Sequence, residues 1–275
     1  MKKTVFILLA VLSFCEAGLS KEKVKEDYTI VKDILYKDGD DYVKERCRLD
    51  IAYVEQRGEP RPVVVWFHGG GLDHGKKAFP DGIMRNRAVV VTVEYRLYPN
   101  TCVDDILDDT AAAVAWIHGN IGEYGGDRTK IFLTGMSAGG YISAMLATAP
   151  KYLGRYGLST GDLAGSIPIS GHMITHYTQR KANGIGYNQP VIDEFAPVYH
   201  VMNKDIPPML LISGDRNLDM AGRFEENDYM EAMLVLNGHK DVKVCEFQGY
   251  GHKGILVTAS LPTIYAWIEK HINGK

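Results

Sequence analysis

Short apolar runs rich in β-branched residues alternate with helical patterns along most of this chain of 275 residues. The apolar runs are typical of buried strands and occupy residues 63–68, 88–95, 130–135, 165–170, 208–214 and 242–247. The helical patterns between and after them are clearest at residues 103–121, 137–149, 223–238 and 261–272. Strands that alternate with helices predict an α/β fold, in which a mostly parallel central sheet carries helices on both faces.

Two segments before this alternation, 28–36 and 46–54, have the pattern of an antiparallel strand pair that extends the sheet. The acidic run 104–109 could suggest a calcium site, but acidic side chains in the first turn of a helix complement its dipole. We therefore interpret the run as a helix start. Residues 171–205 show no clear periodicity, and we treat this segment as a candidate cap or lid insertion.

The amino terminus has the pattern of a secretory signal. Lys2 and Lys3 precede the apolar run 4–14, which is too short to span a bilayer comfortably. We expect a signal peptide over residues 1–20, followed by a single domain over residues 21–275. The mature protein is then expected to be secreted or periplasmic, without stable membrane insertion after cleavage.

Small residues near the end of this signal offer two cleavage points, after Ala17 or after Ser20. Cys15 suggests a lipoprotein as an alternative. Because the bulky Phe14 stands where a lipidation signal requires a small residue, we favour cleavage without a lipid anchor.

Composition excludes several classes of function. A formal net charge of −3 gives no electrostatic reason to expect nucleic acid as a partner. Removal of the signal leaves Cys47, Cys102 and Cys245, an odd number that allows at most one disulfide and no disulfide scaffold. The chain has no zinc-like cysteine and histidine spacing, phosphate loop or dinucleotide fingerprint. We expect neither a metal nor an organic cofactor.

Ser137 lies in the hexapeptide "GMSAGG", between Gly135 and Gly139. It follows the strand 130–135 and precedes a helix of small residues, which is the strand–turn–helix setting of a nucleophile elbow. The glycines on either side allow the strand and the helix to approach each other closely. The sequence therefore predicts Ser137 as a catalytic nucleophile.

An oxyanion hole for this serine can be assembled from two places in the chain. The helix after Ser137 begins with the backbone N–H of Ala138, and "HGGG" follows the strand 63–68. The amides of Gly70 and Gly71 can turn toward a substrate carbonyl oxygen because glycine carries no side chain. His68 is expected to pack the loop rather than to act in the chemistry.

A serine hydroxyl needs a base to take its proton. His252 is the candidate, because it lies in the glycine-flanked loop "GYGHKG" between the strand 242–247 and the last helix. Three other histidines, His172, His176 and His200, fall in the segment 171–205. We expect them at the solvated surface, with substrate contact as the alternative.

The acid that orients His252 should follow the strand 208–214, where the chain offers Asp215 and Asp219. Counting back from the helix at 223–238 favours Asp219, and Asp215 remains the alternative. The aspartate that does not orient His252 is expected to accept hydrogen bonds that fix the loop.

The motifs "HGGG", "VEYRLYP", "GMSAGG" and "GYGH", in this order, resemble the α/β-hydrolase fold. Within that fold they are similar to the hormone-sensitive-lipase and carboxylesterase branch. Members similar to this chain include bacterial secreted esterases that act on acetyl or feruloyl groups of plant polysaccharides, and arylformamidases. One departure is Asn217, which stands three residues after Gly214 where the branch most often has its acid.

This resemblance implies a secreted serine esterase that hydrolyses short-chain carboxylic esters through an acyl-enzyme. Its substrate would be a small-molecule or polysaccharide-linked ester. The alternatives are an arylformamidase-like amidase, a small peptidase, or a non-catalytic binding protein with the hydrolase fold.

Overall fold

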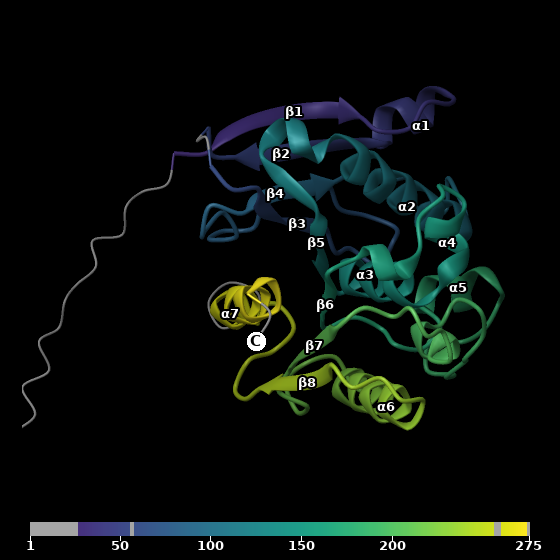
Figure 1. The fold of residues 1–275 in the computed structure, drawn as a ribbon. Helices are drawn as coiled ribbons and strands as arrows, with labels where there is room; N and C mark the ends of the chain where they lie inside the picture. Colours follow the sequence, from purple (N-terminus) through teal and green to yellow (C-terminus); the bar gives the residue numbers. More distant parts are fainter. Residues whose placement is uncertain (1–26, 56–57, 256–259, 274–275) are drawn as a thin grey trace, which may run out of the picture.

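The computed structural model describes residues 27–55, 58–255 and 260–273. Eight strands form a single sheet in the order β1-β2-β4-β3-β5-β6-β7-β8 (Figure 1). Strand β2 pairs antiparallel with β1 and β4, and all other neighbouring pairs are parallel. The strands are β1 (Thr29–Leu35), β2 (Arg48–Tyr53), β3 (Arg61–Phe67), β4 (Val89–Val93), β5 (Gly126–Met136), β6 (Gly165–Ile169), β7 (Met209–Gly214) and β8 (Val242–Phe247). The predicted α/β fold and its antiparallel extension are confirmed.

Helices cover both faces of this sheet. They are α1 (Asp41–Arg46), α2 (Val103–Asn120), α3 (Ala138–Thr148), α4 (Pro150–Gly154), α5 (Tyr177–Ala182), α6 (Arg223–Leu236) and α7 (Leu261–Ile272), with 3₁₀ turns η1 (Ile121–Tyr124), η2 (Thr160–Asp162) and η3 (Pro197–His200). Figure 1 shows α7 on the side of the sheet opposite to α2 and α3. The long helices lie close to the predicted ranges, whereas the three short helices α1, α4 and α5 were not predicted.

The alternation of side chains along the strands divides the core into two layers. Val63, Val65 and Phe67 of β3 belong to the core cluster that includes residues of α2, α3 and α6, whereas Val64 and Trp66 belong to the cluster that includes residues of α7. Both faces of the central strands are thus buried, which explains why these strands are continuous apolar runs.

The sequence also led to predictions for the amino terminus, for the segment 171–205 and for the three cysteines. The predicted signal peptide, with Cys15, lies outside the described residues. In the parts of the chain that are described, no helix is long and apolar enough to cross a membrane. The segment 171–205 contains α5 and η3. Cys47, Cys102 and Cys245 are free thiols.

Candidate active site

The carboxyl ends of the parallel strands meet at one edge of the sheet, where loops after β3, β5, β6, β7 and β8 lie next to one another. A cavity of about 480 Å³ opens at this edge, a volume typical of small-molecule sites. Its lining includes the glycines that follow His68, together with Ser137, Tyr177, Met220 and His252. Two segments far apart in sequence, the predicted elbow and the predicted base loop, therefore face the same space.

Ser137 sits on a strained turn between β5 and α3. Its φ of 57° and ψ of −114° are a conformation that a residue with a side chain adopts only when the surroundings enforce it. Its N–H donates to the carbonyl of Ile169 at 2.8 Å. A Cβ on Gly139 would lie 2.0 Å from the carbonyl oxygen of Phe67, and one on Gly135 would lie 2.5 Å from it. Glycine at both positions thus allows β3 to pass directly beneath the turn.

His252 and Asp219 form a close pair beside this cavity. His252 Nδ1 is 2.7 Å from Asp219 Oδ1, and the Asp219 side chain is only 1% exposed. Burial raises the pKa of a carboxyl, but hydrogen bonds from His252, from Ser170 and from two backbone amides hold the pKa of Asp219 at about 2. Asp219 is therefore an anion that can accept the Nδ1 proton of His252, and Nε2 is then the ring nitrogen left to accept a proton.

Asp215 takes a different place in the same loop. Its carboxylate accepts the N–H groups of Gly249 and Asn217, each at 2.9 Å, and these bonds lower its pKa. The N–H of Asp219 donates to the Asp215 carbonyl at 2.8 Å, which closes a turn. In this turn the Asn217 side chain is exposed, and Asp219 is the residue that contacts His252. The acidic side chain beside His252 thus stands two residues after Asn217.

Ser170 belongs to this cluster and was missed in the sequence. It follows β6 directly, has a φ of 47° and is fully buried. Its Oγ lies 2.8 Å and 3.0 Å from the two carboxylate oxygens of Asp219 and 2.9 Å from His252 Nδ1. The hydroxyl donates to the carboxylate and holds it against the imidazole. Its place at the end of a strand, at the edge that carries the other site residues, was the signal that could have revealed it.

Hydrogen bonds to the carbonyl groups of the glycine loop after β3 hold this loop in place. The Gly70 carbonyl accepts the N–H groups of Asp73 and His74 at 3.1 Å and 3.0 Å, and the Gly71 carbonyl accepts the hydroxyl of Thr178. Gly70 and Gly71 have φ values of 113° and 62°, which favour glycine.

The backbone amides of the loop and of the elbow are candidates for the oxyanion hole. Within residues 27–55, 58–255 and 260–273, no hydrogen bond from the amides of Gly70, Gly71 or Ala138 is found. Amide donors without an acceptor beside a nucleophile can bind a developing oxyanion.

His68 and the strand end "VEYRLYP" support this loop from behind. His68 Nε2 is 3.1 Å from Glu94, and the ring stacks on Tyr95 with centroids 4.2 Å apart. The N–H of Tyr98 donates to the Leu72 carbonyl at 2.8 Å. These contacts agree with a packing function for His68.

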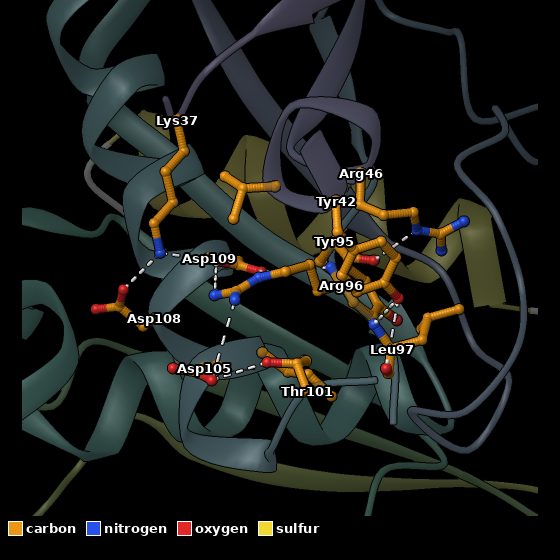
Figure 2. Close-up of polar contacts among 12 residues, drawn as sticks. Lys37, Tyr42, Arg46, Tyr95, Arg96, Leu97, Thr101, Asp105, Asp108 and Asp109 are labelled. Atoms are coloured by element: carbon orange, nitrogen blue, oxygen red, sulfur yellow. Dashed lines mark hydrogen bonds and ion pairs between the residues drawn. The ribbon is translucent and has the colours of Figure 1, made fainter. Parts of the chain in front are cut away.

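Figure 2 shows how the same strand end is tied to α2. Arg96 makes a two-pronged contact with Asp109, at 2.7 Å and 2.8 Å, and Lys37 bridges Asp108 and Asp109. Asp109 is fully buried, and its carboxylate is satisfied by both cations. The acidic run thus lies in helix α2 and in ion pairs. Among the described residues, no cluster of histidine, cysteine and acidic side chains could hold a metal ion.

The expectation for two of the remaining histidines was wrong. His172 and His176 are 6% and 1% exposed, so they do not lie at the solvated surface. His176 packs between Tyr141 and Tyr177, and burial lowers its pKa well below the usual value. The segment had no periodicity by which this burial could be predicted.

Known structures share this architecture over nearly the whole chain. A truncated carbohydrate esterase from gut microbiota superposes with a TM-score of 0.73 at 17% identity, covering 90% of this chain and 98% of the other. Esterase B from Lactobacillus rhamnosis superposes with a TM-score of 0.72 at 18% identity, covering 92% and 87%. The chain has the α/β-hydrolase fold. In this fold Ser137 follows β5 on a strained turn, and His252 lies in the loop after β8.

Sequence relatives point to the same branch. Residues 49–156 match the BD-FAE family model. Carboxylesterase NlhH of Mycobacterium tuberculosis is 42% identical over 98 residues, which is 34% of this chain and 31% of the relative. Esterase LipC of the same species is 25% identical over 223 residues, 70% of this chain and 53% of the relative. The chain thus spans only about a third to a half of these two relatives. These matches confirm the resemblance to the hormone-sensitive-lipase and carboxylesterase branch.

Proposed function

We propose that this α/β hydrolase is a serine esterase that cleaves short-chain carboxylic esters. The observation that carries the proposal is that Ser137, on a strained turn, lines the same cavity as His252, whose Nδ1 is 2.7 Å from the Asp219 carboxylate. These are the nucleophile, base and orienting acid of an acyl-transfer site. The esterase relatives and the esterase structures with this fold support the same reaction class.

In the first half of the proposed reaction, Ser137 Oγ attacks the ester carbonyl carbon while its proton moves to His252 Nε2. The carbonyl oxygen becomes an oxyanion that accepts hydrogen bonds from the amides of Gly70, Gly71 and Ala138. The C–O bond to the alcohol then breaks, and His252 gives its proton to the departing oxygen. This leaves an acyl group on Ser137.

In the second half, a water molecule attacks the acyl carbon and gives a proton to His252 Nε2. The bond to Ser137 Oγ breaks, and the proton returns to the serine. Asp219 keeps its negative charge throughout and stabilises the imidazolium that forms twice in the cycle.

For the acyl group we propose acetyl or feruloyl, carried on a polysaccharide. The matching carbohydrate esterase structure supports a carbohydrate ester. The loop of polar and aromatic residues over 171–205, rather than a continuous apolar surface, supports a short or aromatic acyl group. The basic and apolar start of the chain supports export of the mature enzyme.

The test is hydrolysis of a p-nitrophenyl ester series from acetate to long chains, together with acetylated xylan, by the purified mature chain. Ser137→Ala is the control. The proposal expects rapid acetate release that is lost in Ser137→Ala. Failure of the folded wild-type protein to cleave any ester would instead favour an amidase, a peptidase or a non-catalytic protein.

A further inference from the structure

A second cavity, of about 220 Å³, adjoins the cavity that contains Ser137. Both cavities are lined by Met220. Tyr177 of the first cavity packs against Tyr187 of the second, with ring centroids 5.4 Å apart. The two cavities are therefore neighbours that share Met220.

Arg180 lines the second cavity and is only 4% exposed. Its Nη1 donates to the carbonyls of Tyr187 and Gln189, which holds the loop after α5 in place. Its Nε has no acceptor, and in the described part of the chain no carboxylate lies within 4.0 Å of the guanidinium. Two neutral carbonyls need no charged donor, so the loop contacts alone do not account for a buried cation.

Arg223 is a second buried cation in the same cavity, 2% exposed. Its Nη1 donates to the Ser170 carbonyl, and its Nη2 lies 3.0 Å from His172 Nε2. Within the described residues its Nε is also without an acceptor, and no carboxylate lies within 4.0 Å.

The remaining polar groups of the cavity include one imidazole and one carboxylate, those of His172 and Glu226. Because Arg223 donates to His172 Nε2, the proton of His172 is on Nδ1, which donates to Glu226 at 2.9 Å. Burial and the charge of Arg223 lower the pKa of His172, so this imidazole is neutral. Glu226 supplies a single negative charge, and it is bound by His172 and by the N–H of Met173. Two guanidinium groups thus line the cavity with one carboxylate. The Asp219 carboxylate, outside the lining, also acts on the charge of Arg223, so among the described residues Arg180 is the cation that lacks a carboxylate partner.

We propose that this second cavity is a carboxylate subsite, which binds an acidic group of the substrate while the ester lies at Ser137; the inference rests on the proposed esterase function. A buried charge is normally paired, and the planar guanidinium matches a carboxylate in shape and in hydrogen bonding. The carboxylate could belong to the acyl chain, as in the half-ester of a dicarboxylic acid. It could equally belong to the alcohol, as in an acetylated uronic acid.

The entrance to the Ser137 cavity has the same sign of charge. Lys76 and Lys253 line it, both are exposed, and no aspartate or glutamate is part of its lining. The chain as a whole has a net charge of −3, so this positive region is local rather than general. It favours the approach of an anionic ester.

Two substrate pairs test the subsite and locate the acidic group. The acyl pair is p-nitrophenyl hydrogen succinate against p-nitrophenyl butyrate. The alcohol pair is an acetylated methyl glucuronide against the corresponding acetylated methyl glucoside. We expect kcat/KM to be at least about tenfold higher for the charged member of one pair, the ratio for a charge-assisted hydrogen bond. The pair with the preference identifies which side of the ester carries the carboxylate.

A matched pair of variants tests whether Arg180 provides this preference. Arg180→Gln removes the buried charge, and Lys181→Gln removes an exposed charge from the neighbouring position of α5. The ratio of kcat/KM for the charged and neutral esters should fall to near one in Arg180→Gln and stay at the wild-type value in Lys181→Gln. If Arg180→Gln does not fold, the kcat/KM ratio of the wild-type protein for the charged and neutral esters decides whether the subsite exists.

The two possible failures can be told apart. If wild-type protein cleaves neutral esters in a Ser137-dependent way but shows no preference for the charged member of either pair, the subsite is wrong and the esterase proposal stands. A preference that survives unchanged in folded Arg180→Gln also contradicts the subsite. If no ester is cleaved in a Ser137-dependent way, both proposals fall.

Discussion

Two aspartates in one loop have sharply different surroundings, and this difference bears directly on the proposed mechanism. Asp219 contacts His252, whereas the Asp215 carboxylate accepts backbone amides of its own loop and of the loop after β8. The same residue type, four positions apart, thus serves the site in one case and the loop in the other.

We expect Asp219→Asn to lower kcat by about 10⁴-fold, because an amide favours the wrong imidazole tautomer and cannot stabilise the imidazolium. Asp215→Asn should keep kcat within a few-fold of wild type. Steady-state kinetics on p-nitrophenyl acetate, with circular dichroism to verify folding, make the comparison. A larger loss of kcat in Asp215→Asn than in Asp219→Asn would instead assign the role of the acid to Asp215.

Ser170 is expected to act as a positioning residue. In Ser170→Ala the Asp219 carboxylate loses one hydrogen bond and can turn away from His252, so kcat should fall about tenfold, as for one charge-assisted bond, with KM little changed. Ser166→Ala is the matched control, since Ser166 of β6 is likewise buried but its hydroxyl donates to a backbone carbonyl. If both variants lose stability alike and neither loses kcat selectively, Ser170 is merely structural.

The elbow between β5 and α3 depends on close contact between elements. In Gly139→Ala the new Cβ would meet the Phe67 carbonyl of β3, a backbone group that can yield only if the strand moves. We expect the variant to lose roughly 3 kcal/mol or more of unfolding free energy, the upper range for overpacking.

Gly119→Ala in α2 is the control for this substitution. A Cβ there meets nothing within 4 Å, so this variant should be neutral or more stable by about 0.5–1 kcal/mol, because alanine favours the helix. Urea unfolding of both variants gives the comparison. Equal stability of Gly139→Ala and wild type would contradict the packing of the elbow.

The strands and the long helices could be predicted because each carries its own periodic signal. The short helix α5 has only six residues, too few for a clear period, and most of its neighbours in the segment 171–205 are irregular. Its position matters for function, since Tyr177 and Arg180 lie on it and line the two cavities. The sequence therefore predicted the edge of the sheet that carries Ser137 and His252 better than the wall that faces it.

Contacts between distant segments explain the rest of what was missed. Arg223 reaches Ser170 and His172 across more than fifty residues of sequence. No local sequence pattern predicts such a contact, and a single arginine at the start of a helix is common. Motifs predicted the elbow, the glycine loop and the base loop, but the buried cations required the folded chain.

The fold as a whole should lose stability in acid partly through Asp219. Its pKa is about 2 in the folded protein against an ordinary 3.8, so the ionised form stabilises the fold above about pH 4. That contribution, about 2 kcal/mol, is lost as the pH falls through 2.

The difference in unfolding free energy between wild type and Asp219→Asn isolates this effect. It should shrink by about 2 kcal/mol between pH 5 and pH 2. Urea unfolding at a series of pH values measures it, and a difference that does not change with pH would contradict the anionic state of Asp219.

Covalent labelling with a fluorophosphonate probe tests the serine-hydrolase mechanism most directly, because the probe reacts only with an activated serine. We predict one adduct per chain of folded wild-type protein, on the peptide that contains Ser137. Labelling should be absent in Ser137→Ala and far slower in His252→Ala. A folded wild-type protein that takes up no probe, or takes it up equally in Ser137→Ala, would contradict the proposed nucleophile and with it the esterase mechanism.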